Sequence, residues 1–218
     1  AKKLAGVIGK LTNDNSQGEL YLTDVIEILR IEGGTIAAAL IEDFIEILGV
    51  NDRVQLAESA ALLRDRINEG FMRAGVTIVD PTTTWIDATA EIANDVTIFP
   101  GTAILGSSKI ATGAVIGPRT TLESCNVLEG ANVVESNCIE ATIGAGANVG
   151  PYSYLRKGTE LGTGSKAGAF VEMKNAKVGD GSKVPHLSYV GDATIGEGSN
   201  IGAATIFVNY DGVDKHHT

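Results

Sequence analysis

The sequence has few aromatic residues, few cysteines and no strongly apolar segment. Phenylalanine, tryptophan and tyrosine make up only 5% of its 218 residues, whereas hydrophobic residues of all kinds reach 44%. That content is enough for a packed core, so the chain is globular rather than disordered. Aromatics are scarce and glycine is abundant, with 27 residues, so the core must consist of small and branched aliphatic side chains, as in a solenoid.

The cysteines and the apolar segments exclude several classes of protein. Cys125 and Cys138 have no metal-ligand spacing, which favours reduced, structural thiols. No apolar run reaches the roughly 18 residues that span a bilayer, and the N-terminus lacks the pattern of a signal peptide. These absences predict a cytoplasmic protein.

Basic charge is also scarce. The formal net charge is −10, and no run of lysine and arginine forms a basic stripe. Such a surface repels phosphate backbones and anionic lipids. We therefore expect neither nucleic acid nor a membrane as a partner.

The first 75 residues show helix and strand signals. The SQGE sequence at residues 16–19 predicts a capping box that opens a helix through Leu29, ended at Gly33. Residues 35–41 have the pattern of a short strand. A longer helix is predicted from Arg53 to Arg73, because apolar residues recur there at helical spacing, and it would form a connector.

From Ile86 onward an aliphatic residue returns at every sixth position. The first run comprises Ile86, Ile92, Ile98, Ile104, Ile110, Ile116, Leu122, Leu128 and Val134. After a shift of phase the pattern resumes from Ile143, again from Val178 and again from Ile195. A small side chain follows most of these residues four places later, which predicts that both positions face inward.

A six-residue repeat corresponds to one short strand and one corner. Three repeats then form a triangular coil whose strands stack on those of the next coil. The repeat gives no signal for a left-handed coil, since parallel crossovers are ordinarily right-handed. The phase shifts near Ala141 and Lys174 predict loops or bulges that leave the coil, and Lys177 stands where a small residue is expected.

The last third of the sequence contains polar residues that the repeat does not need. They are Arg156, Lys174, His186, Tyr189, Asn200, Asn209, Tyr210 and Lys215. With about 18 residues per coil, Arg156 and Lys174 lie one coil apart, so two stacked cations favour an anion such as phosphate. The alternative is that both are solvated corner residues.

His186 is the best candidate for a general base, because an imidazole accepts a proton near neutral pH. The alternative is a histidine that caps a corner of the coil. A zinc site like that of the γ-class carbonic anhydrases would need three converging imidazoles. His216 and His217 are sequence neighbours and cannot easily both reach a metal that His186 also binds, so this reading is weak.

Several longer strings in the sequence match motifs of a known enzyme family. They are YLRKG at residues 154–158, GAFVEMKNAKVG from Gly168, KVPHLSYVGDATIG from Lys183, NIGAAT from Asn200 and NYDGVDKHHT at the end. Upstream, LTNDNSQGELYLTDVI and GVNDRVQL add two more. Together they resemble the bacterial bifunctional N-acetylglucosamine-1-phosphate uridyltransferase/glucosamine-1-phosphate N-acetyltransferases, and the resemblance covers essentially the whole chain.

The resemblance implies a mainly β protein, a left-handed parallel β-helix of hexapeptide repeats. It assigns residues 76–218 to the acetyltransferase β-helix, incomplete at its C-terminal end, and residues 53–75 to a connector helix. Residues 1–52 would be an α/β remnant of the uridyltransferase domain. Most of that domain is missing, since the glycine-rich nucleotide loop is absent. We therefore expect weak activity at best from this chain alone, and a homotrimer with active sites between chains.

The resemblance also implies a reaction and a set of site residues. Acetyl-CoA would acetylate the amine of glucosamine-1-phosphate, and UTP would convert the product to UDP-N-acetylglucosamine for cell-wall synthesis. By motif, His186 is the base, and Ala203, Asn209 and Tyr210 contact acetyl-CoA. The residues that bind the sugar phosphate would be Arg156, Lys174, Tyr189, Asn200 and Lys215. Asn51, in the GVND string, matches a ligand of the catalytic Mg²⁺.

Two other functions remain open from the sequence. One is a different hexapeptide-repeat acyltransferase, acting on serine, a xenobiotic or an acyl-carrier protein, although the NYDG and EMKNA strings argue against it. The other is a non-catalytic solenoid that serves assembly, although such a module would not need the polar cluster. One departure from the family pattern is Lys157, which replaces the more usual proline after Arg156.

Overall fold

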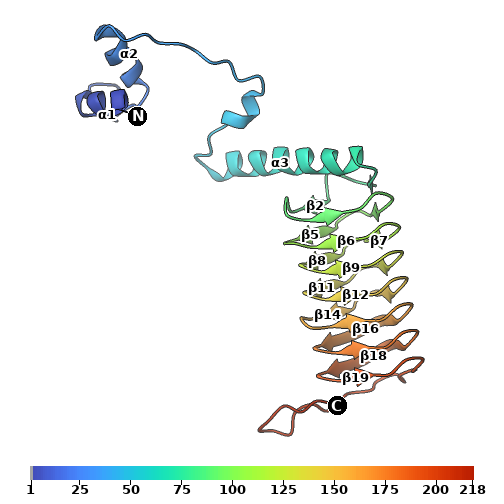
Figure 1. Ribbon diagram of the computed structural model, residues 1–218. Helices are drawn as coiled ribbons and strands as arrows, with labels where there is room; N and C mark the ends of the chain where they lie inside the picture. The colour runs from blue at the N-terminus through green and yellow to red at the C-terminus, as the bar shows by residue number, and fades with distance from the viewer. Residues whose placement is uncertain (1) are drawn as a thin grey trace. The chain divides into compact units, whose positions relative to one another are not determined.

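The computed structural model describes residues 2–218, which divide into one compact unit up to Gly49 and a second from Val50 onward. The first unit contains α1 (Lys2–Val7), the 3₁₀ helix η1 (Ile8–Lys10), α2 (Asp24–Ile31) and the 3₁₀ helix η2 (Phe44–Ile47). Its buried hydrophobic residues are Val7 and Val25. The second unit contains the long helix and all the strands (Figure 1).

The predicted capping box at residues 16–19 is wrong. The Asn15 side chain accepts hydrogen bonds from the Gln17 N–H at 3.1 Å and the Glu19 N–H at 3.3 Å, and these bonds fold the segment into a turn. Helix α2 therefore begins only at Asp24. Its predicted end is confirmed, because the chain leaves the helix at Gly33, which has a φ of +78°.

The strand predicted at residues 35–41 is also wrong. These residues form no strand, and residues 2–49 contain no other strand with which they could pair. A single extended segment leaves its backbone groups without partners, so apolar content alone does not make a strand. Leu40, near the end of the segment, is 96% exposed.

Helix α3 (Arg53–Arg73) has the predicted bounds. The Asp52 carboxylate caps its first turn by accepting a hydrogen bond from the Gln55 N–H at 2.8 Å. Near its end, the fully buried Asn68 donates hydrogen bonds to the Pro81 and Thr84 carbonyl oxygens, each at 3.0 Å. The helix thereby covers the open end of the first coil (Figure 1).

Below α3 the chain winds into a column of short parallel strands (Figure 1). The strands are β1 (Thr77–Ile78), β2 (Trp85–Ile86), β3 (Glu91–Ile92), β4 (Thr97–Ile98), β5 (Ala103–Leu105), β6 (Lys109–Ile110), β7 (Val115–Ile116), β8 (Thr121–Glu123), β9 (Asn126–Val127), β10 (Asn132–Val133), β11 (Asn137–Ile139), β12 (Thr142–Ile143), β13 (Asn148–Val149), β14 (Tyr154–Leu155), β15 (Glu160–Leu161), β16 (Lys166–Lys174), β17 (Lys177–Val178), β18 (Lys183–Gly191) and β19 (Thr194–Ile195).

Each strand pairs in parallel with the strand one coil further along. One face consists of β3, β6, β9, β12, β15, β17 and β19. The other two faces join into one sheet, because β16 and β18 continue around a corner. The predicted parallel β-helix is therefore confirmed, and the left-handed sense of the coil stays a prediction from the resemblance.

The core is a stack of small and aliphatic side chains, as the composition predicted. The inward aliphatic positions are fully buried from Ile98 through Leu122 except for small residual exposure at Ile110. The predicted register then fails, because Val127 and Val133 face inward in place of Leu128 and Val134. The cause is a side of the coil that is one residue shorter than the repeat.

Five sides of the coil have five residues instead of six, which explains the phase shifts. Each short side turns through one residue with a positive φ that is not glycine. These residues are Ser124, Glu135, Glu140, Asn175 and Asp192. The loops predicted near Ala141 and Lys174 do not form, because the sides of the coil there have one residue fewer and the chain continues the coil without leaving it. Lys177 is accordingly exposed, and Ala176 takes the inward position.

The two cysteines belong to this core, as predicted. Cys125 and Cys138 are free and buried. The Cys125 thiol donates a hydrogen bond to the Cys138 carbonyl oxygen at 3.2 Å. Burial raises the pKa of both thiols, which keeps them protonated and unreactive.

Candidate functional site

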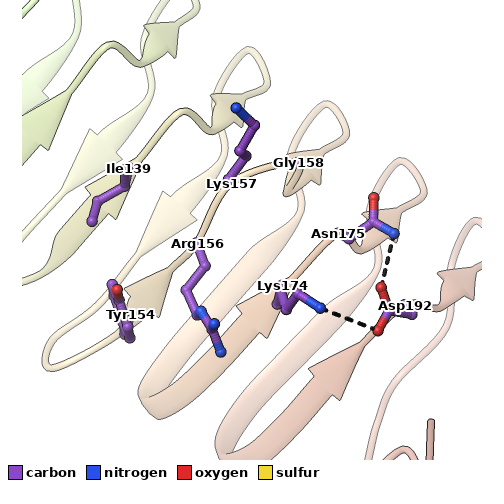
Figure 2. A pocket seen from close by; sticks show the side chains of 8 residues that line it. All are labelled: Ile139, Tyr154, Arg156, Lys157, Gly158, Lys174, Asn175 and Asp192. Carbon is purple, nitrogen blue, oxygen red and sulfur yellow. Dashed lines mark hydrogen bonds and ion pairs between the residues drawn. The ribbon is translucent and has the colours of Figure 1, made fainter. Parts of the chain in front are cut away.

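A groove of about 470 Å³ lies on the outer surface of the last coils. It is lined by Ile139, Tyr154, Arg156, Lys157, Gly158, Lys174, Asn175 and Asp192. Figure 2 shows these side chains on successive coils, with Arg156 next to Lys174 and Asp192 beyond it. The groove therefore combines three cations with an aromatic and an aliphatic wall.

Arg156 and Lys174 are neighbours, as the coil length predicted. Leu155 pairs with Met173, so the residues that follow them lie side by side on adjacent coils. The Arg156 guanidinium lies 2.9 Å from the Glu172 carboxylate. Both cations are only partly exposed, and two partly exposed cations one coil apart form a site suited to an oxyanion.

Asp192 is a member of the groove that the sequence prediction missed. Its carboxylate lies 3.5 Å from the Lys174 ammonium and accepts hydrogen bonds from the side-chain amides of Asn175 and Asn209. The hydrogen bond from Asn175, followed by those from Asn209 and Lys174, lowers the pKa of Asp192 below its ordinary value. One signal in the sequence could have pointed to Asp192. The side of the coil between Val190 and Ile195 is one residue short, and such a side needs a residue that tolerates a positive φ, as aspartate does.

Tyr189 and Asn209 lie against the end of β18. A Cβ atom built on Gly191 would lie 2.3 Å from the Tyr189 hydroxyl and 2.7 Å from the Asn209 amide nitrogen. Glycine at 191 therefore lets these two polar groups approach the backbone next to Asp192. The structure thus brings together Arg156, Lys174, Tyr189 and Asn209 on one side of a corner.

His186 lies on the other side of that corner. It pairs with Ala169 and precedes Leu187, which turns the corner with a φ of +52°. Lys183 pairs with Asn200, and the same offset of 17 residues sets Ala203 beside His186. His186, Asn200 and Ala203 are all exposed, and none of them lines the groove. The predicted site residues therefore occupy two adjoining faces of the coil.

Tyr210 and Lys215 lie in a hairpin at the end of the chain. They form an antiparallel bridge, and the Tyr210 hydroxyl donates to the Gly212 carbonyl oxygen at 2.8 Å. Between them Asp211 lies 2.7 Å from the His216 ring. Both predicted site residues are exposed and neither lines the groove.

The residues around Asn51 do not make a magnesium site by themselves. The Asn51 backbone N–H donates to the Gln55 side chain, and Asp52 is occupied as the cap of α3. Mg²⁺ prefers an octahedral set of oxygen ligands. Across residues 2–218 no three histidine, cysteine, aspartate or glutamate side chains gather in a metal-binding arrangement.

The histidines do not converge on a zinc ion. His216 contacts Asp211, and His217 contacts the Thr194 hydroxyl at 3.3 Å, whereas His186 lies on β18. The alternative of a zinc site therefore has no support in the geometry.

None of the helices that the structure describes in residues 2–218 has the length and apolar character of a membrane span.

Over its whole length the chain is similar to curated proteins that share the name bifunctional protein GlmU. It is 57% identical over 218 residues to the bifunctional protein GlmU of Rhodococcus jostii, covering 100% of this chain and 44% of that protein. It is 54% identical over 215 residues to the bifunctional protein GlmU of Corynebacterium diphtheriae, covering 99% and 44%. The chain thus spans less than half the length of the curated relatives that it matches.

Other comparisons are weaker. A solved hexapeptide transferase family protein from Anaplasma phagocytophilum shares 22% identity, covers 62% of this chain and 75% of that chain, and has a TM-score of 0.32. No family model matches the sequence. At 57% identity over all 218 residues, this chain is a homologue of one part of the bifunctional GlmU proteins.

Proposed function

We propose that this chain carries the acetyltransferase site of a bifunctional enzyme, which transfers the acetyl group of acetyl-CoA to the amine of glucosamine-1-phosphate. The observation that supports it most is the identity of 57% with a GlmU protein over the whole length of the chain. The groove between Arg156 and Lys174 is suited to the phosphate of this substrate.

Each polar residue then has a role. Arg156 and Lys174 bind the sugar phosphate at the groove. Tyr189, Asn200 and Lys215, which do not line the groove, would contact the same substrate once a neighbouring copy completes the pocket. Ala203, Asn209 and Tyr210 contact acetyl-CoA. His186 and Ala203 lie one coil apart, so a thioester held at Ala203 would meet an amine held at His186.

The chemistry needs a base at His186. The imidazole removes a proton from the substrate ammonium, and the neutral amine attacks the thioester carbonyl carbon. A C–N bond forms, the nitrogen gives up a second proton and the C–S bond breaks, so that one proton goes to the departing CoA thiolate and the other to solvent. His186 is exposed next to a corner of the coil, where a substrate can reach it.

The test is an acetyl-transfer assay with glucosamine-1-phosphate, in which the free CoA thiol is measured. We expect His186→Ala to lower kcat by about 10²-fold or more, the usual contribution of a general base. His217→Ala is the matched control, because His217 contacts only Thr194 and should keep the full rate. Equal rates for both variants would contradict the role of His186.

The active assembly is proposed to be a homotrimer. In one chain the groove and the His186 group lie on adjoining faces and neither is enclosed, so a neighbouring copy would complete the pocket. Closed cyclic assemblies of identical chains are common among soluble proteins.

The remaining assignments also belong to this proposal. The unit up to Gly49 would be the end of a uridyltransferase domain that uses UTP and Mg²⁺ to form UDP-N-acetylglucosamine for the cell wall. Asn51 would supply one magnesium ligand, and the others would come from outside this chain. The two free thiols fit a cytoplasmic enzyme.

A further inference from the structure

The Asp192 side chain makes contacts with the candidate site that are not needed to form the corner of the coil. Its backbone already closes the corner, because its N–H donates to the Lys174 carbonyl oxygen at 2.9 Å and its carbonyl accepts from the Thr218 N–H at 2.9 Å. The carboxylate adds contacts to side chains of both neighbouring coils. One oxygen accepts from the Asn175 amide at 2.9 Å, and the other is shared by Lys174 and Asn209.

The shared oxygen joins residues that have different ligands in the proposed function. Lys174 is assigned to the sugar phosphate and Asn209 to acetyl-CoA. Figure 2 shows Lys174 extended toward Asp192 across the groove. The Asp192 side chain is only 15% exposed, so water competes weakly for these bonds.

The contact with Asp192 is the one that the buried Asn209 side chain makes to the coil. Among residues 196–218 it alone is buried, and its amide donates a short hydrogen bond to Asp192. The segment from Asn200 to Tyr210 also contacts the coil through its bridges to Lys183 and Tyr189 and through Ile201 and Phe207, which pack against the core. The carboxylate therefore anchors the far end of that segment next to Lys174.

We infer that Asp192 is a positioning residue that holds Lys174 and Asn209 on one carboxylate and so couples the sugar-phosphate subsite to the acetyl-CoA subsite. The inference rests on the proposed function. If the carboxylate is replaced by an amide, the negative charge that attracts the Lys174 ammonium is lost, and one acceptor oxygen remains where Asn175, Lys174 and Asn209 now share two. Both subsites then loosen together.

The test is Asp192→Asn in the full natural protein, with KM measured for each substrate in turn. We expect both KM values to rise about tenfold, as for the loss of one charge-assisted hydrogen bond, while kcat changes less than about threefold. The matched control is Asp180→Asn, since Asp180 also bonds the previous coil, through the Thr163 N–H at 2.7 Å, but has no contact with the groove. Its KM values should not change.

Four results would overturn the inference. A rise in only one KM would show that the subsites are not coupled. Unchanged KM values in an active Asp192→Asn protein would contradict only the positioning role of Asp192. A wild-type protein without acetyl transfer would contradict the proposed function as well. If Asp192→Asn does not fold, Asn209→Ala tests the same link, because it should raise the KM for glucosamine-1-phosphate, and an unchanged value would contradict the coupling.

Discussion

At Gly168 the distance between two coils is set by the absence of a side chain. A Cβ atom at this position would lie 1.8 Å from the Pro185 carbonyl oxygen on the next coil. Gly196 also follows an inward aliphatic residue, yet a Cβ atom there meets nothing within 4 Å. The same residue type at equivalent points of the repeat is therefore required at one position and dispensable at the other.

We expect Gly168→Ala to destabilise the protein by about 1–3 kcal/mol, the usual cost of forced overpacking. The clash is with backbone, so no rotamer change can relieve it. Gly196→Ala is the matched control and should stay within about 0.5 kcal/mol of the wild type. Denaturant unfolding of both variants measures the difference, and equal midpoints would contradict the close approach at Gly168.

The terminal hairpin is an element to whose stability one carboxylate contributes. Asp211 accepts hydrogen bonds from the Asp214 and Val213 N–H groups, each at 2.8 Å, and pairs with His216. The bond from Asp214, followed by those from His216 and Val213, lowers the pKa of Asp211 from 3.8 to about 2. A carboxyl whose pKa is lower in the folded state stabilises that state above its unfolded pKa.

The hairpin should therefore be fully formed above about pH 4 and open as the pH falls toward about 2. Amide chemical shifts of Val213 and Asp214 across this range measure the transition. Asp211→Asn should abolish the transition, because the variant has no proton to gain. A midpoint near the ordinary aspartate pKa would contradict the hydrogen bonding described for Asp211.

A helix with a capping residue and apolar residues at helical spacing was predictable from the sequence. A strand that needs a neighbouring strand to pair with was not. Helix α3 has a cap at Asp52 and apolar residues at helical spacing, and its predicted bounds are correct. The strand predicted at residues 35–41 had only apolar content and no partner. The helix predicted from residue 16 failed because the Asn15 side chain bonds to the backbone two and four residues later.

At the scale of the whole molecule, the two groups of candidate residues predict an assembly. The groove at Lys174 and the exposed His186 face adjoining sides of the coil, so each lacks an opposite wall in a single chain. Light scattering of the full natural protein should give the mass of three copies, and dilution below the dissociation range should lower its activity. A fully active monomer would contradict the shared pocket.

The sequence by itself determined the repeat, the parallel coil, the filling of its core and the pairing of Arg156 with Lys174, because a six-residue period leaves one way to bury the aliphatic residues. The phase shifts before Val178 and Ile195 were visible in the sequence, whereas only the tertiary structure showed that the period first drops to five before Val127 and how the chain turns at each short side. A short side depends on whether Asn175 or Asp192 can take a positive φ and bond to the adjacent coil, and neither property is visible in hydrophobic spacing. For the same reason the corner separating His186 from the groove, and the contacts of Asp192, emerged only from the folded chain.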